Sequence, residues 1–159
     1  LPLSHIILHP RLGKQQYKGE VDLNGFEAFY HGCDKPLLYN GDLHTIEDIQ
    51  TVAERFPRLA GVVIGRGLLA KPALAWEYQQ NRKLSPDEML SKVKQLHTAI
   101  YNSYEEQLQG GETQLLMKMK NFWEYLLPNG NRKAKKTIHK TSKLTNYRIA
   151  VNDLLSSYQ

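Results

Sequence analysis

The sequence predicts an α/β domain followed by an all-helical domain, and three observations lead to this prediction. Short apolar runs alternate with segments of helical period through the first half of the chain, whereas the second half has helical periods only. The charges are also unevenly placed. Residues 1–111 carry 12 Lys/Arg and 13 Asp/Glu, and residues 112–159 carry 9 and 3. We expect domains at 1–83 and 84–159, with the second facing a polyanion.

The first domain consists of three expected strand–helix units. Apolar runs at 5–8, 36–39 and 62–64 are too short for helices, and the run at 62–64 predicts a fully buried parallel strand. Helices are expected at about 23–31, after Thr45, and after Pro72. Thr45 is followed by a carboxylate three residues on, as in a capping box, and Pro72 suits a first helical turn. This alternation predicts a parallel sheet, in either a TIM (β/α)8 barrel or a doubly wound fold.

The second domain is expected to be a small bundle of four helices. One starts at Ser85-Pro86, with Glu88 closing a capping box, and the next spans about 112–127. A lysine-rich segment follows. The apolar face of the last helix runs from Leu144 to Tyr158. Short connections between helices of this kind are typical of a bundle.

Polar tripeptides follow the three predicted strands: His9-Pro10-Arg11, Asn40-Gly41-Asp42 and Gly65-Arg66-Gly67. The carboxyl ends of parallel strands meet at one edge of a sheet or barrel. Glycines let backbone N–H groups approach a ligand, and Arg66 supplies a cation, which together suit a phosphate group. Each tripeptide alone fits an ordinary buried histidine, turn or solvated arginine. Their occurrence at the same end favours a shared site.

Four lysines in the second domain are evenly spaced. Lys133, Lys136, Lys140 and Lys143 lie three, four and three residues apart, which on one helix forms a single stripe. A solvated face is the ordinary interpretation of such a run. Like charges this close repel one another, however, and a nucleic-acid backbone would offset that repulsion and release counterions. The charges therefore favour RNA as a partner.

Composition excludes several classes of protein. No apolar run approaches the length of a membrane span. The single Cys33 excludes an internal disulfide framework and fits a reducing compartment. The N-terminus lacks the basic and apolar regions of a signal peptide, and it also lacks a Met. We expect a cytoplasmic protein with no metal site, represented by a piece of a longer chain.

The order and separation of four motifs resemble the tRNA-dihydrouridine synthases. The motifs are His9-x-Arg11, Gln16-Tyr17-x-Gly19, Asn40-Gly41-Asp42 and Ile64-Gly65-Arg66-Gly67 with Pro72 after it. Members of this family reduce uridine in tRNA with FMN, which NADPH recharges. The resemblance is close over residues 5–80 and looser beyond. It implies strands six to eight of a TIM barrel, followed by the family's C-terminal helical domain.

The resemblance also implies roles for particular residues. The flavin would be lined by His9, Asn40, Gly41 and Asp42, its phosphate bound by Gly65 and Arg66, and the RNA contacted by Arg11 and the four lysines. The family's catalytic cysteine and flavin-contacting lysine belong to the first half of the barrel, so no catalytic residue is expected here. Cys33 precedes a strand, at the wrong end to replace that cysteine. Alone, the chain would be inactive, and it would pair with the missing half barrel or self-associate.

Two other functions explain part of the sequence. A different FMN-dependent barrel oxidoreductase, similar to dihydroorotate dehydrogenase, accounts for the phosphate site but leaves the lysines unused. A non-catalytic RNA-binding module leaves the three tripeptides unexplained. We therefore expect flavin-dependent reduction of uridine to dihydrouridine in tRNA.

Overall fold

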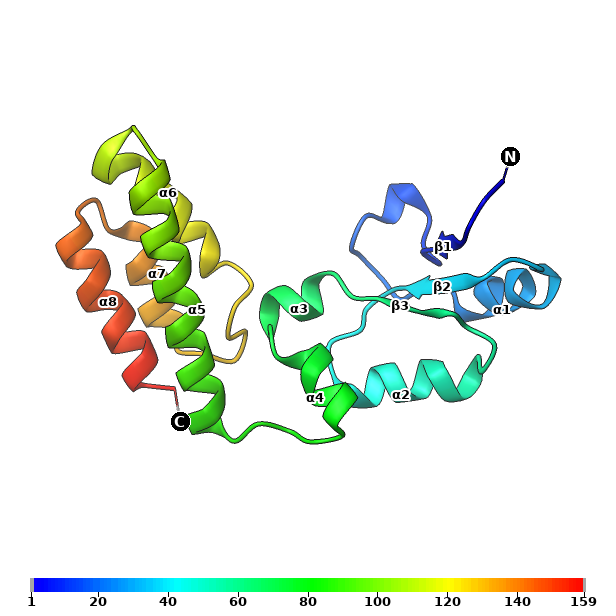
Figure 1. Ribbon diagram of the computed structural model, residues 1–159. Coiled ribbons are helices and arrows are strands. Elements are labelled where there is room, and N and C mark those ends of the chain that lie inside the picture. Colours follow the sequence, from blue (N-terminus) through cyan, green and yellow to red (C-terminus); the bar gives the residue numbers. More distant parts are fainter. Residues whose placement is uncertain (1, 159) are drawn as a thin grey trace. The chain divides into compact units, whose positions relative to one another are not determined.

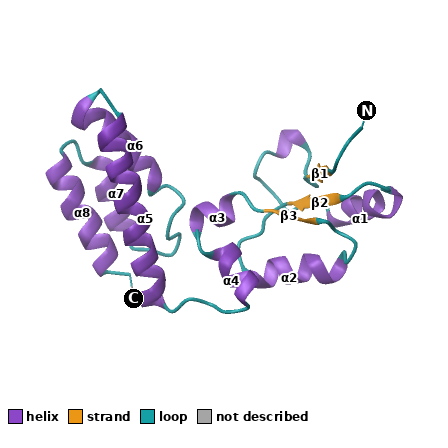
Figure 2. Ribbon diagram, viewed as in Figure 1, coloured by secondary structure: helices purple, strands orange, loops and turns teal. Residues whose placement is uncertain are grey.

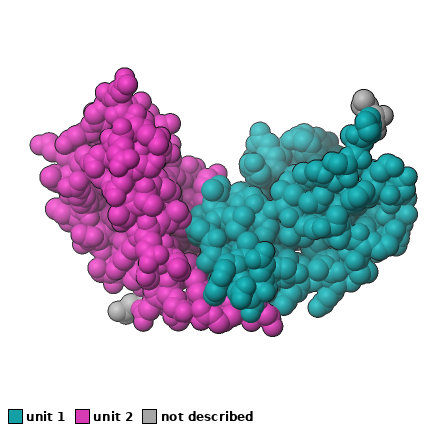
Figure 3. All heavy atoms as spheres, in the orientation of Figure 1, with its two compact units in different colours: residues 1–80 teal, residues 81–159 magenta. Residues whose placement is uncertain are grey.

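The computed structural model of the protein describes residues 2–158. The chain divides into two compact units, Leu1–Gln80 and Asn81–Gln159, which are coloured separately in Figure 3. The first unit contains all the strands found among the described residues, and the second is helical.

Unit 1 is built on a parallel sheet with strand order β1-β2-β3 (Figures 1 and 2). The helices α1 and α2 connect the successive strands, and a short 3₁₀ helix, η1, lies in the loop before α1. The predicted alternation of short strands and helices is thus confirmed. The elements are β1 (Ile6–Leu8), η1 (Gly13–Gln15), α1 (Leu23–Gly32), β2 (Leu37–Asn40), α2 (Ile46–Arg55), β3 (Gly61–Val63), α3 (Arg66–Ala70) and α4 (Leu74–Gln80).

Local sequence explains where these helices begin. The capping box predicted at the start of α2 is confirmed, because the Thr45 hydroxyl accepts from the Asp48 N–H and the Asp48 carboxylate accepts from the Thr45 N–H. The helix predicted after Pro72 is present as α4, which begins at Leu74, and a short helix that was not predicted, α3, precedes it. Gly65 ends the extended chain and α3 starts at Arg66, so that Pro72 lies between α3 and α4.

The two faces of the sheet have different surroundings. Leu37 and Tyr39 of β2 face the helices and are 3% and 1% exposed. The strand register places Ile7 beside Leu38, on the opposite face, and Ile7 is 50% exposed. The prediction of a fully buried strand at 62–64 is therefore wrong for this chain, in which β3 is only partly buried. Helices cover one face of the sheet, and the apolar side chains of the other remain open.

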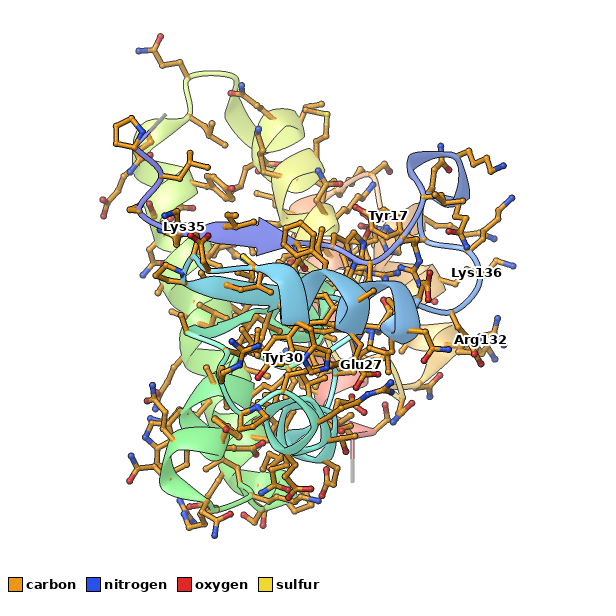
Figure 4. All side chains as sticks on the ribbon, turned by 90° about the vertical axis from the view of Figure 1, so that its right-hand side faces the viewer. Tyr17, Glu27, Tyr30, Lys35, Arg132 and Lys136 are labelled. Carbon is orange, nitrogen blue, oxygen red and sulfur yellow. The ribbon has the colours of Figure 1, made fainter. Side chains whose placement is uncertain are left out.

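Aromatic rings fill the space between the sheet and its helices. Phe26 of α1 meets Tyr39 and Phe56 edge-on, with ring centroids 4.9 Å apart in each pair. All three rings are almost completely buried. Tyr30, labelled in Figure 4, continues the cluster and accepts a 2.8 Å hydrogen bond from the Arg58 N–H. This core fixes β2, and hence the strand end that carries Asp42.

Unit 2 consists of four helices among its described residues, as predicted. The capping box at Ser85 and Glu88 is confirmed, with Pro86 in the first turn. The second helix ends at Phe122, short of the expected residue 127. Lys143 lies between the last two helices as the N-cap of the fourth, so the single four-lysine stripe is wrong. The helices are α5 (Pro86–Gln107), α6 (Gly111–Phe122), α7 (Arg132–Lys140) and α8 (Leu144–Ser156).

A hydrogen-bonded aromatic cluster holds three of these helices together. The Tyr147 hydroxyl accepts from the Trp123 Nε1–H at 2.8 Å and lies 2.8 Å from His97 Nε2. The His97 ring stacks on Tyr147 at an interplanar angle of 22°. Burial lowers the pKa of His97 to about 4 and raises that of Tyr147. The imidazole is therefore neutral at pH 7 and belongs to the core of the bundle.

None of the helices in residues 2–158 combines the length and the apolar character that crossing a membrane requires.

Candidate functional site

The three polar tripeptides of the sequence lie at one edge of the unit 1 sheet. Because β1, β2 and β3 are parallel and in register, the residues that follow each strand emerge on the same side. His9 Nδ1 lies 2.5 Å from the Asn40 carbonyl oxygen, which links the end of β1 to the end of β2. The predicted convergence of these segments is present in the structure.

The centre of this edge is the Asp42 carboxylate, which two arginines share. Arg11 approaches it in a fork, with Nη2 at 2.6 Å from Oδ2 and Nη1 at 3.3 Å from Oδ1. The Arg66 Nη2 lies 2.7 Å from Oδ1. Hydrogen bonds from Arg11 hold the pKa of Asp42 below its ordinary value, with a smaller contribution from the charge of Arg66. Asp42 therefore stays ionised and anchors both guanidinium groups.

Arg11 is a structural cation. Its side chain is 1% exposed, and Nη2 also donates to the Gly19 carbonyl oxygen at 2.6 Å. A side chain so placed cannot reach an RNA phosphate without breaking these contacts, so we correct the assignment of Arg11 to the RNA surface. The Arg11 Nε is buried and, among the described residues, has no hydrogen-bond partner.

Arg66 is the accessible cation of the site. Its side chain is 31% exposed, and Asp42 engages it at Nη2. The ring of Tyr17 covers the guanidinium, with 4.3 Å from Cζ to the ring centroid. Tyr17 belongs to the loop that joins β1 to α1 and is labelled in Figure 4. The sequence offers no local signal for this contact, because 49 positions separate the two residues.

The three glycines of the site differ in what surrounds them. A Cβ at Gly67 would lie 2.0 Å from the Leu43 carbonyl oxygen, so only glycine fits there. A Cβ at Gly41 would lie 2.8 Å from the Tyr39 hydroxyl oxygen. A Cβ at Gly65 would meet nothing within 4 Å. Gly67 and Gly41 thus serve the packing, and the backbone at Gly65 faces open space beside Arg66.

This arrangement can bind an anion. One carboxylate and two guanidinium groups leave a formal excess of one positive charge, and the accessible part of that charge is on Arg66. Guanidinium groups and exposed backbone N–H groups are the usual partners of phosphate. The Asp42 carboxylate would repel an anion at close range. Its position therefore suits a role in holding Arg66 in place and not in contacting the ligand.

The lysines of unit 2 do not all have the same environment. Lys133, Lys136 and Lys140 are exposed on α7, where Arg132 and Lys136 can be followed in Figure 4. Lys143 is exposed at the start of α8. By contrast, Lys135 Nζ donates to the Leu126 carbonyl oxygen at 2.5 Å and is partly buried. Three lysines of α7 and one beyond it are therefore exposed, together with Arg132 at the start of α7.

Cys33 lies away from the strand-end site. It caps the C-terminus of α1, before β2, and its thiol contacts the Lys35 carbonyl oxygen at 3.6 Å. It is partly exposed. The expectation that Cys33 lies before the strand, at the opposite end from the tripeptides, agrees with this position.

Comparison with known proteins gives the family. Residues 3–159 match the family model described as dihydrouridine synthase (Dus). A probable tRNA-dihydrouridine synthase from Rhizobium leguminosarum bv. phaseoli is 34% identical over 67 residues, which make up 42% of this chain and 21% of that protein. The chain thus covers about a fifth of the length of this relative in the matched segment. The family match includes both units, and the chain belongs to the dihydrouridine synthase family.

Proposed function

We propose that the protein takes part in the FMN-dependent reduction of uridine to dihydrouridine in tRNA, with the strand-end site of unit 1 holding the FMN phosphate. The observation that carries the proposal is the pair of arginines fixed by Asp42 beside the open backbone at Gly65. Membership of the family and the tRNA-dihydrouridine synthase named among its relatives support this substrate and reaction.

The residues present fit a flavin phosphate. This group carries nearly two negative charges, and the partly exposed guanidinium of Arg66 provides a fixed, planar donor set for it. The open space in front of Gly65 allows an oxygen to approach the backbone. We assign Gly65 and Arg66 to the phosphate, and His9, Asn40 and Gly41 to the neighbouring parts of the cofactor. Asp42 serves the same site by positioning Arg66.

When bound, FMN supplies the hydride for the uracil ring and is itself recharged by NADPH. The residues of this chain bind and orient the cofactor in this proposal. We assign no proton transfer to them, since the one cysteine among the described residues lies at the other end of β2. The general acid is expected on another part of the family's barrel.

We further propose that the three β/α units are consecutive units of a TIM barrel. The uncovered face of the sheet carries Ile7, Leu38 and Val63, which would face the barrel interior. The free edges of β1 and β3 would pair with further strands. Where those strands are absent, this apolar surface favours self-association of the chain.

For the tRNA, we propose contact with Lys133, Lys136, Lys140 and Lys143 of unit 2. Replacing all four lysines by alanine should reduce the slope of log affinity against log salt by about 0.7–0.9 for each tRNA phosphate that is no longer neutralised. A matched control replaces Lys92 and Lys94 of α5, two of the other exposed lysines of unit 2. Filter binding at several salt concentrations measures both slopes. An unchanged slope in the fourfold variant would contradict the assignment of these lysines.

The reaction itself is tested in a preparation that includes the catalytic part of the enzyme. With NADPH and unmodified tRNA, Arg66→Ala should lower dihydrouridine formation when FMN is limiting, and added FMN should restore it. The weakened affinity should correspond to about 2–3 kcal/mol, the usual scale for removal of a charge-assisted bond. Dihydrouridine is measured by mass spectrometry of digested tRNA. Failure to form it at any FMN concentration with the unaltered protein would contradict the proposed function.

A further inference from the structure

We propose that Tyr17 is a positioning residue for Arg66, and that the loop at residues 12–20 becomes ordered together with the phosphate site. The proposal rests on the proposed function, because it concerns the same phosphate group. It adds a link between the cofactor site and a segment that precedes α1, which no sequence pattern connects to Arg66.

The contacts of the loop concentrate on the two arginines of the site. The Gly19 carbonyl oxygen accepts a 2.6 Å hydrogen bond from Arg11, and the Tyr17 ring stacks on the Arg66 guanidinium. Nearly all the residues from 12 to 20 are exposed, so little apolar packing holds this segment. Within the loop, Gln15 accepts a hydrogen bond from the Leu12 N–H at 2.8 Å. The position of the loop therefore depends on where the arginines are held.

Arg66 is held on two sides before any ligand arrives. Asp42 fixes Nη2, and the ring of Tyr17 fixes the plane of the guanidinium. An unrestrained arginine side chain loses rotamer entropy when it binds an anion. A stacked guanidinium has lost part of that freedom already, which raises its affinity for phosphate.

The coupling works in both directions. If the stack favours phosphate binding, bound phosphate must favour the stack by the same factor, because binding free energies are linked. A phosphate that holds Arg66 in place thereby gives Tyr17 a fixed partner and orders the loop. Occupancy of the cofactor site would then determine the conformation of an exposed surface segment at the same edge of the sheet.

The aromatic ring of Tyr17 carries this effect, so the ring and the hydroxyl can be tested separately. Tyr17→Phe preserves the stack and Tyr17→Leu removes it. Phe29→Leu is a matched control, because Phe29 is also an exposed aromatic of unit 1 and lies on α1. The Leu variant of residue 17 should bind FMN about two- to fivefold more weakly, the range expected for an exposed cation–π contact. The Phe variant and the Phe29 control should bind as the unaltered protein does.

The second readout is hydrogen exchange of the loop amides in the complete protein, with and without FMN and with inorganic phosphate as a separate probe. Ligand should slow exchange at residues 13–19 in the unaltered protein and in Tyr17→Phe, and not in Tyr17→Leu. If FMN binds but Tyr17→Leu shows the same affinity and the same protection, the inference is overturned while the proposed function stands. If neither FMN nor phosphate protects the loop in the unaltered protein, the inference is overturned as well. Absence of FMN binding with protection by phosphate would contradict the flavin assignment alone.

Discussion

Replacing Asp42 with asparagine should destabilise unit 1 through loss of one negative charge. Asparagine matches aspartate in size and tolerates the positive φ of 36° at this position. It has only one oxygen, however, whereas the carboxylate uses both. The NH₂ group of the asparagine would face a guanidinium, and two hydrogen-bond donors cannot bond to each other. The substitution therefore removes the charge interaction and leaves the backbone conformation unchanged.

The magnitude follows from the burial of the two partners. Arg11 is 1% exposed, so its charge would remain in the protein with the Gly19 carbonyl as its other partner. Asparagine keeps one acceptor oxygen, so one of the two Arg11 bonds is lost, at about 1.5–3 kcal/mol, and Arg66, which is partly exposed, adds at most about 1 kcal/mol. We expect Asp42→Asn to lower the free energy of unfolding of unit 1 by about 2–3 kcal/mol at pH 7.

The effect should depend on pH in a defined direction. The pKa of Asp42 lies lower in the folded protein than its ordinary value of 3.8. The carboxylate therefore contributes its full stabilisation above about pH 5 and loses it as the pH falls through the folded-state pKa. The difference between the unaltered protein and the variant should be constant from about pH 7 to pH 5 and should shrink below pH 3.8.

Native-state hydrogen exchange of the amides in β2 measures this free energy for unit 1 separately from unit 2. The control is Asp34→Asn, because the Asp34 carboxylate is 84% exposed and its nearest lysine nitrogen is 3.5 Å away. This control should change the free energy by less than about 0.5 kcal/mol. If Asp42→Asn also stays within about 0.5 kcal/mol, the carboxylate does not anchor the arginines, and the reasoning is wrong.

Three further predictions test other parts of the structure. Gly67→Ala should prevent stable folding of unit 1, because its Cβ would collide with the Leu43 carbonyl oxygen, whereas Gly65→Ala should fold normally and bind FMN more weakly. Circular dichroism measures the folding of both variants, and flavin titration measures the FMN affinity. Equal folding of both variants would contradict the packing argument. Tyr147→Phe should lower the stability of unit 2 by about 1–3 kcal/mol, because the Trp123 N–H loses its acceptor. Unit 2 should also lose stability as the pH falls from 6.5 toward 4, because the pKa of His97 is lower in the folded state and the unfolded chain therefore binds the proton first. A free energy of unfolding that stays constant over this pH range would contradict the buried neutral imidazole.

Much of the fold was predictable because local signals specify it. The capping boxes at Thr45 and Ser85 and the short apolar strands predicted the start of two helices and the parallel sheet correctly. The burial of β3 was not predictable. Apolar residues on both sides of a strand show that the strand can be buried on both faces. They do not show whether this chain contains the elements that would pack on both faces.

The candidate site was predictable as a place, and its internal contacts were not. The tripeptides located the strand ends, since parallel strands must end at one edge. The role of Arg11 depended on Asp42, which lies 31 positions away, and that of Arg66 on Tyr17. Nothing in the spacing of the residues distinguishes an arginine that holds a carboxylate from one that faces RNA. In the same way, even spacing could not show that α7 ends before Lys143.

If the strand-end site recognises a flavin through its phosphate, comparison of FMN with riboflavin tests this recognition most directly. Riboflavin has the same ring system and lacks the phosphate group. Titration of both ligands into the unaltered protein and into Arg66→Ala, followed by flavin fluorescence, gives four affinities. We predict that FMN binds the unaltered protein more tightly than riboflavin by about 2–3 kcal/mol, and that Arg66→Ala removes most of this difference while riboflavin affinity stays the same. Equal affinities for the two ligands in the unaltered protein, or a preference that survives in Arg66→Ala, would contradict the claim.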